Sequence, residues 1–209
     1  MIHCIGDSHT HIFRDSPFFM VHWIGPVTAS HIGNKLSHID SVIQNVSPDD
    51  FLLFSMGEID CRVFFETKIE YYKSISSSKD RTEIIESVVN KYFNLLYDVY
   101  GKNHKLIFWG PVASYPNKQS SEYLGFHPDS QFFQPGSYTN KERNELTKIF
   151  NERLKQLCDE KDVLFLTMFY DMLDENYNTK AEMTDGIIHL HVDTKPLVME
   201  KFKSINLIS

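Results

Sequence analysis

The sequence predicts an α/β fold with three layers, in which helices cover both faces of a central, mainly parallel, five-stranded sheet. Short apolar runs alternate with longer amphipathic stretches about five times along the chain. Several runs are apolar throughout, which is typical of strands buried on both faces. With 209 residues and no visible repeat or linker, the chain is expected to form one domain, residues 1–209.

The expected strands are apolar runs that stop at a glycine or a polar residue. The first spans Ile2 to Ile5 and stops at Gly6, and polar residues follow at once. The others span residues 18–25, 51–56, 105–109 and 163–168. Open α/β sheets keep their chemistry at the carboxyl ends of the strands, so the residues after each run are the first candidates for a site.

Helices are expected where apolar residues recur at three- and four-residue spacing. These stretches span residues 29–46, 81–100, 138–161 and 195–204. Residues 66–80 are polar and contain a cluster of serines, which favours a loop. Residues 112–137 hold three prolines among Ser, Asn and Gly, and we expect them to run over the active edge of the sheet.

The composition argues against several kinds of partner. The net charge is -7 and no basic block offsets it, so nucleic acid is not expected to bind. No run approaches the roughly 18 apolar residues of a membrane span. No basic segment followed by an apolar core opens the chain, so the cytoplasm is the expected compartment. The three cysteines are too widely spaced for a disulfide framework or a zinc ribbon.

Three polar clusters are expected to meet at one edge of this sheet. Residues 7–9 (Asp-Ser-His) follow the first strand, residues 57–60 (Gly-Glu-Ile-Asp) follow another, and residues 185–191 can fold back from the last loop. Together they supply a serine hydroxyl, a late aspartate and histidine, and glycines with unobstructed backbone N–H groups. These are the parts of acyl transfer, in which an oriented imidazole takes the hydroxyl proton and N–H groups stabilise the oxyanion.

The same clusters resemble the sequence blocks of a known family. Residues 6–9 (Gly-Asp-Ser-His) resemble the GDS block that opens SGNH (GDSL-type) hydrolases, and residues 57–60 resemble the family's Gly-x-Asn-Asp block. Residues 185–189 are similar to its closing Asp-x-x-His block. The order and spacing of the blocks cover nearly the whole chain. The resemblance implies a flavodoxin-like α/β/α fold.

The resemblance also implies roles for individual residues. Ser8 would be the nucleophile, His189 the base, and Asp185 the acid that orients it. The backbone N–H groups of Ser8 and Gly25 would form the oxyanion hole, with Gly57 as a further donor. No metal and no cofactor are expected.

Two departures from the family pattern leave questions open. Ile59 stands where the family has an Asn whose amide donates to the oxyanion, and Ile donates nothing. Arg62 replaces that donor only if its side chain turns inward. The closing block has one extra residue between Asp185 and His189, so His191 is an alternative base.

Further polar residues beside the blocks are candidates for substrate binding: Asp7, Glu58, Asp60, Arg62 and His191. Some of them also have a structural interpretation. Glu58 fits a solvated carboxylate, and Asp60 fits a helix cap. Arg62 fits an ion-pair partner of either carboxylate.

Two other kinds of protein are compatible with these residues. Asp7, His9 and His11 fit the Asp-x-His-x-His pattern of amidohydrolase and PHP-type metal enzymes, and residues 6–9 also resemble the Gly-Asp-x-His of metallophosphoesterases. Against a metal enzyme, barrels of that kind usually need about 250 residues. A non-catalytic, carbohydrate-binding relic of the SGNH fold is the other alternative, because Ile59 removes an oxyanion donor.

The function expected from the sequence is that of a serine esterase or acyltransferase acting on an acyl ester, through an acyl-serine intermediate. The substrate is expected to be a small molecule or a carbohydrate ester. An acetyl ester of a carbohydrate is favoured because residues 112–137 are rich in Tyr, Asn, Gln and Ser, which can bind sugar hydroxyls and stack on a sugar ring.

Overall fold

The computed structural model describes residues 1–75, 79–115, 138–186 and 188–209. Within these residues a five-stranded sheet lies at the centre, in the order β2-β1-β3-β4-β5, and every neighbouring pair is parallel. The expected fold class is confirmed. The strands are β1 (Ile2–Gly6), β2 (Phe19–Trp23), β3 (Phe51–Ser55), β4 (Lys105–Trp109) and β5 (Leu164–Leu166).

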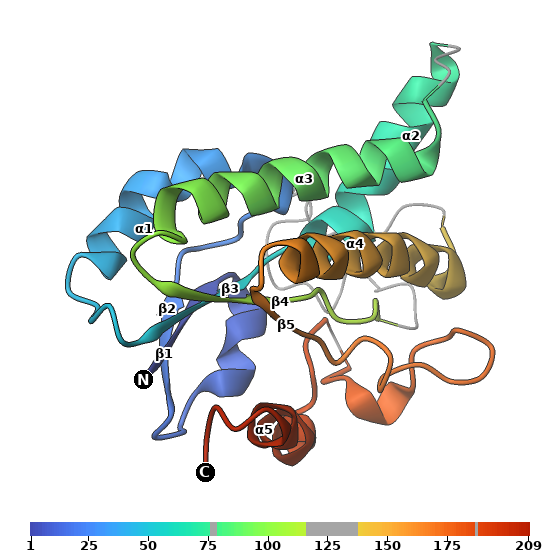
Figure 1. Ribbon diagram of the computed structural model, residues 1–209. Helices are drawn as coiled ribbons and strands as arrows, with labels where there is room; N and C mark the ends of the chain where they lie inside the picture. Colours follow the sequence, from blue (N-terminus) through green and yellow to red (C-terminus); the bar gives the residue numbers. More distant parts are fainter. Residues whose placement is uncertain (76–78, 116–137, 187) are drawn as a thin grey trace.

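Helices cover both faces of the sheet, as Figure 1 shows. The helices on one face are α1 (Leu36–Ile43), α2 (Phe65–Ser74), α3 (Arg81–Tyr100) and α4 (Asn140–Glu160). The opposite face carries the 3₁₀ helix η1 (Ser8–Phe13) and the helix α5 (Lys195–Ser204). Shorter segments are η2 (Ala29–Lys35), η3 (Asp60–Phe64), η5 (Ala181–Met183) and η6 (Val192–Thr194).

Two apolar cores result from the alternation of side chains along each strand. Ile5 and Phe108 lie in the core beneath α1 to α4, whereas their neighbours Cys4 and Trp109 lie in the core beneath η1 and α5. In the second core the Trp109 ring stacks on that of Phe202 in α5, with centroids 5.8 Å apart. Burial on both faces explains why these strands are mostly apolar.

The register of the sheet brings three loops to one edge. Gly6, the last residue of β1, pairs with Trp23 at the end of β2 and with Ser55 at the end of β3. The loops that follow β1, β2 and β3 therefore start side by side, as the sequence predicts. Gly6 has to be glycine, because a Cβ there would lie 2.2 Å from the carbonyl oxygen of Ser55.

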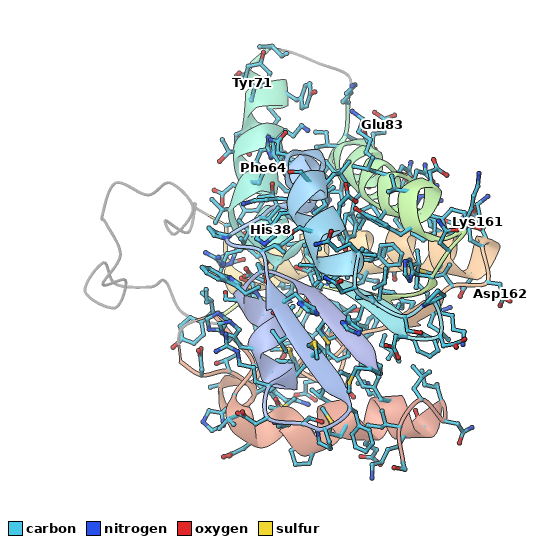
Figure 2. All side chains as sticks on the ribbon, turned by 90° about the vertical axis from the view of Figure 1, so that its left-hand side faces the viewer. His38, Phe64, Tyr71, Glu83, Lys161 and Asp162 are labelled. Atoms are coloured by element: carbon cyan, nitrogen blue, oxygen red, sulfur yellow. The ribbon has the colours of Figure 1, made fainter. Side chains whose placement is uncertain are left out.

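Two expected elements differ from the structure. The stretch 29–46 is η2 followed by α1 rather than one helix, and the backbone at His31 leaves helical geometry (φ -118°, ψ 16°). Part of the expected loop 66–80 is the helix α2, whose buried residues include Phe65 and Ile69. Figure 2 shows exposed Tyr71 near the far end of α2, away from the sheet. Of the expected excursion at 112–137, residues 116–137 lie outside the described part of the chain.

No helix in the described part of the chain combines the length and the apolar character that crossing a bilayer requires.

Candidate active site

A serine, a histidine and an aspartate from opposite ends of the chain lie in hydrogen-bond contact. Ser8 Oγ is 2.8 Å from His189 Nε2, and His189 Nδ1 is 2.9 Å from Asp185 Oδ2. Ser8 opens η1 directly after β1, and Asp7 caps that short helix by accepting a hydrogen bond from the backbone N–H of His9. The structure thus brings together the three residues that the sequence predicts as nucleophile, base and acid.

The loop that carries the histidine is closed on itself. Thr184 and Leu190 form an antiparallel bridge, and Asp185 donates its backbone N–H to the carbonyl oxygen of His189 at 2.9 Å. Asp185 Oδ1 accepts the backbone N–H groups of Ile188 and His189, at 3.0 Å and 3.1 Å. One carboxylate oxygen therefore holds the loop while the other orients the imidazole.

The extra residue in this block is accommodated by a turn. Gly186 has a φ of +83°, a left-handed conformation that glycine adopts without strain. His191, the alternative base, makes a different contact: its Nδ1 accepts the backbone N–H of Asp193 at 3.2 Å and caps η6. The imidazole beside the Ser8 hydroxyl is that of His189.

Ser8 and His189 line an open pocket of about 360 Å³. Its other walls include His11, Arg14 and Lys195, which are basic, and His191. The reacting atoms of a substrate can therefore reach the hydroxyl from solvent.

Two glycines lie at this edge with left-handed backbone. Gly25 follows β2 with a φ of +91°, and Gly57 follows β3 with a φ of +111°. Ile24, next to Gly25, donates its backbone N–H to the carbonyl oxygen of Gly6 at 2.9 Å, which ties this loop to the end of β1. A Cβ on Gly57 would lie 2.6 Å from the ring of Phe150. Both positions thus favour glycine, because other residues rarely adopt a left-handed backbone.

A buried charged network lies behind these residues. His9 Nδ1 is 3.0 Å from Asp7 Oδ1, and His9 Nε2 is 3.0 Å from the carbonyl oxygen of Ile188 and 3.7 Å from Glu58 Oε2. Burial alone would lower the pKa of His9, but the carboxylates of Asp7 and Glu58 raise it to about 9. His9 is therefore charged at neutral pH.

Glu58 and Arg62 form a buried ion pair in the same network. Arg62 Nε donates to Glu58 Oε1 at 2.6 Å, and Arg62 Nη2 donates to Glu58 Oε2 at 3.2 Å. Both residues are only 3% exposed. Burial raises the pKa of Glu58, but Arg62 and His9 outweigh burial and hold that pKa below its usual value. Glu58 is thus a paired carboxylate rather than a solvated one.

Sequence reasoning offered Arg62 as a partner of either carboxylate, but it did not predict the network as a whole. Glu58 and Arg62 stand four residues apart, the spacing at which opposite charges meet on one helical turn. The contact of His9 with Glu58 had no such local signal, because it depends on how the two loops are placed in the fold. His9 itself was assigned only to the metal alternative.

Asp60 makes structural contacts with a neighbouring helix. Asp60 is fully buried, and its carboxylate accepts the backbone N–H groups of Ala29 at 2.6 Å and Ser30 at 3.2 Å. Burial raises the pKa of Asp60 to about 6, although these hydrogen bonds oppose the rise. Asp60 thereby holds the start of η2 against η3, in agreement with the helix-cap interpretation.

Ile59 faces an apolar groove instead of a polar site. The groove has a volume of about 530 Å³, and Val27, Val63 and Phe64 are among its other lining residues. Figure 2 shows Phe64 near the base of α2, close to the helices that follow β2, and its ring lies edge-on to that of His31. The side chain at position 59 offers no hydrogen-bond donor to an oxyanion.

The residues of the metal alternative are used differently. Asp7 and His9 bond to each other, and His11 Nε2 is buried without a hydrogen-bond partner. Among the residues that the structure describes, no three His, Cys, Asp or Glu side chains are grouped so that they could hold a metal ion.

Solved structures similar to this chain include esterases and a lipase. A GDSL-like lipase from Bacteroides thetaiotaomicron matches 99% of this chain and 86% of its own, with a TM-score of 0.60 and 11% identity. A carbohydrate acetylesterase from Sinorhizobium meliloti matches 98% of both chains, with a TM-score of 0.56 and 15% identity. An acetylxylan esterase from Geobacillus stearothermophilus matches 98% of this chain and 93% of its own, with a TM-score of 0.56 and 14% identity.

No protein-family model matches the sequence, and no curated protein matches it. Because the sequence identities to these structures are only 11–15%, the similarity is evidence for the fold alone.

Proposed function

Because the chain has the SGNH hydrolase fold, we propose that it is a serine esterase or acyltransferase that forms an acyl-serine intermediate. The observation that carries the proposal is the pair of contacts from Ser8 Oγ to His189 Nε2 and from His189 Nδ1 to Asp185 Oδ2, at 2.8 Å and 2.9 Å. A serine hydroxyl becomes an effective nucleophile when a base within hydrogen-bond reach takes its proton.

The proposed reaction has two halves. In the first, Ser8 Oγ attacks the ester carbonyl carbon while His189 Nε2 takes the hydroxyl proton. The tetrahedral intermediate then collapses, His189 returns the proton to the leaving alkoxide, and the acyl group stays on Ser8. In the second half, His189 deprotonates water or an acceptor hydroxyl, which attacks the acyl-serine. The acid or new ester then leaves as His189 returns the proton to Ser8 Oγ. Asp185 stabilises the imidazolium in both halves.

The oxyanion is proposed to be held by backbone donors. We assign this role to the N–H groups of Ser8, Gly25 and Gly57, since the loops that carry them start side by side at the sheet edge. A donor of this kind contributes on the order of 3 kcal/mol to the transition state. Because Ile59 contributes none, and Arg62 is bonded to Glu58, the hole depends on backbone groups.

The proposed substrate class is an acetyl ester of a carbohydrate. Two of the similar structures are described as a carbohydrate acetylesterase and an acetylxylan esterase, which supports this choice. The open pocket beside Ser8 is large enough for a sugar ring, and its basic and histidine side chains can bind hydroxyl groups. Hydrolysis and transfer to a sugar hydroxyl share the first half-reaction and differ only in the acceptor.

Comparing wild type with Ser8→Ala on p-nitrophenyl acetate and on acetylated xylo-oligosaccharides tests the proposal. We expect the variant to lose at least about 10³-fold in kcat, because acyl transfer cannot begin without the hydroxyl. Circular dichroism and the thermal midpoint should remain unchanged, since Ser8 is a partly exposed residue. Equal turnover by the two proteins would rule out the serine mechanism.

Carbohydrate binding without catalysis is the second candidate function, and the observation that favours it is Ile59 in place of an oxyanion donor. In that case the wild-type chain would hydrolyse neither ester, and calorimetry would still detect binding of the oligosaccharide.

A further inference from the structure

We propose that His9 is a positioning residue for the catalytic base: its ring, fixed between Asp7 and Glu58, holds the loop of His189 and presents a positive charge to the His189 imidazole. The proposal rests on the proposed function, because it assumes that His189 is the base. It assigns a task to a residue that the resemblance to SGNH hydrolases does not use.

The His9 ring lies between the two segments that carry Ser8 and His189. His9 is buried, and its Nε2 lies 3.0 Å from the carbonyl oxygen of Ile188, the residue directly before His189. This contact joins η1, which also carries Ser8, to the loop that carries the base. A shift of the His9 ring would therefore move His189 relative to the Ser8 hydroxyl, on which proton transfer depends.

Both ring nitrogens of His9 face hydrogen-bond acceptors. Nδ1 faces the carboxylate oxygen Asp7 Oδ1 at 3.0 Å, and Nε2 faces a carbonyl oxygen. A neutral imidazole has one N–H group and satisfies only one of them, whereas the imidazolium has two. The geometry thus selects the charged ring, in agreement with the pKa of about 9.

The charges around His9 balance. The ring and Arg62 supply two positive charges, and Asp7 and Glu58 supply two negative ones. Buried carboxylates need such partners, because an uncompensated charge in the interior is strongly destabilising. Replacing His9 by a neutral residue would leave a net negative charge beside the catalytic loop.

The rings of the two histidines lie close together, with centroids 5.0 Å apart. At this range the positive charge of His9 acts directly on the imidazole that exchanges the proton with Ser8.

Other groups also face His189. Asp185 on its own loop lies 2.9 Å from His189 Nδ1, and Glu58 after β3 and His11 on η1 interact electrostatically with the same ring. Ser8 contributes only its neutral hydroxyl. His9 thus adds a positive charge at a site where Asp185 and Glu58 present negative ones.

The test is a titration of the histidine rings by NMR, with kcat/KM measured over the same pH range, for wild type and His9→Gln. In wild type we expect the His9 ring to stay protonated above pH 8. In His9→Gln we expect the midpoint of His189 and the acid limb of kcat/KM to move up together, by roughly 0.5–2 pH units. The loss of activity below the new midpoint should fall on kcat rather than on KM.

His38→Gln is the matched control, because it removes an exposed imidazole on α1, labelled in Figure 2, and should leave the His189 midpoint unchanged. An unchanged midpoint in His9→Gln would overturn the proposal. If that variant does not fold, the wild-type titration decides, since a His9 ring that loses its proton below pH 7 also overturns it. Wild-type protein without Ser8-dependent turnover contradicts the proposed function instead.

Discussion

Ser8 Oγ lies 2.8 Å from His189 Nε2, although 181 residues separate the two in the chain. Each of the two residues is fixed in place by its own segment of the chain. Ser8 is fixed because it opens η1 at the end of a buried strand, and His189 is fixed because Asp185 closes the loop around it.

Removing each candidate base should identify the one that works. We expect His189→Ala to lower kcat by about 10²–10⁴-fold, the usual contribution of a positioned general base. His191→Ala should act mainly on KM, because its ring lines the pocket while its Nδ1 accepts the Asp193 N–H. Steady-state kinetics on p-nitrophenyl acetate measures both. A larger kcat loss in His191→Ala would mean that the loop rearranges to bring His191 to Ser8.

Asp185→Asn should separate the two tasks of this carboxylate. An amide oxygen can still accept the backbone N–H groups of the loop, but an amide does not stabilise the imidazolium or fix its tautomer. We expect kcat to fall by as much as about 10⁴-fold, by analogy with the Ser-His-Asp triad, while the thermal midpoint changes little. If the activity of the variant stays within tenfold of wild type, Asp185 is not the orienting acid.

Glu58→Gln should destabilise the fold, because it leaves Arg62 buried beside a neutral amide. We expect a loss of about 3–5 kcal/mol in the free energy of unfolding, measured by urea denaturation. Asp159→Asn is the control, since Asp159 and Lys155 form an ion pair in which both side chains are more than half exposed. Exposed pairs contribute below about 1 kcal/mol. Similar losses in the two variants would show that burial of the Glu58 pair has no special cost.

Asp60 should make stability depend on pH. Its pKa is about 6 in the folded chain against an ordinary value of 3.8, so the folded state holds the proton more tightly between these values. The contribution of Asp60 to the free energy of unfolding is therefore full below about pH 4. It falls by about 3 kcal/mol as the pH rises through 6.

Asp60→Asn removes that titration while keeping one acceptor for the N–H groups of η2. The difference in unfolding free energy between the variant and wild type should therefore shift in favour of the variant from pH 4 to pH 7. Urea unfolding at several pH values measures this difference, and a pH-independent difference would contradict the raised pKa.

Much of the fold was predictable because burial leaves a strong pattern. The strands are mostly apolar, and α3 and α5 begin and end where the periodicity predicts, at Arg81, Tyr100, Lys195 and Ser204. The helix α2 was missed because it is mostly exposed and places few apolar residues, such as Phe65 and Ile69, in the core. The change from η2 to α1 at Leu36 and the non-helical backbone of His31 within η2 leave no mark in the periodicity.

The candidate site was predictable only in part. The grouping of Ser8, Asp185 and His189 was predicted because the resemblance joins three short blocks far apart in the sequence, whereas spacing left His189 and His191 equivalent. The surroundings of Asp60 and the contact of His9 with Glu58 join separate loops. Such contacts between separate loops leave no local signal.

Labelling with a fluorophosphonate probe, followed by mass mapping of the modified residue, tests the central claim most directly. The probe reacts with serines that a neighbouring base has activated. We predict one adduct on Ser8 of the wild-type chain, formed at least about 100-fold more slowly in His189→Ala. An unmodified Ser8 in a chain that still cleaves p-nitrophenyl acetate, or an adduct on another residue, would contradict the account.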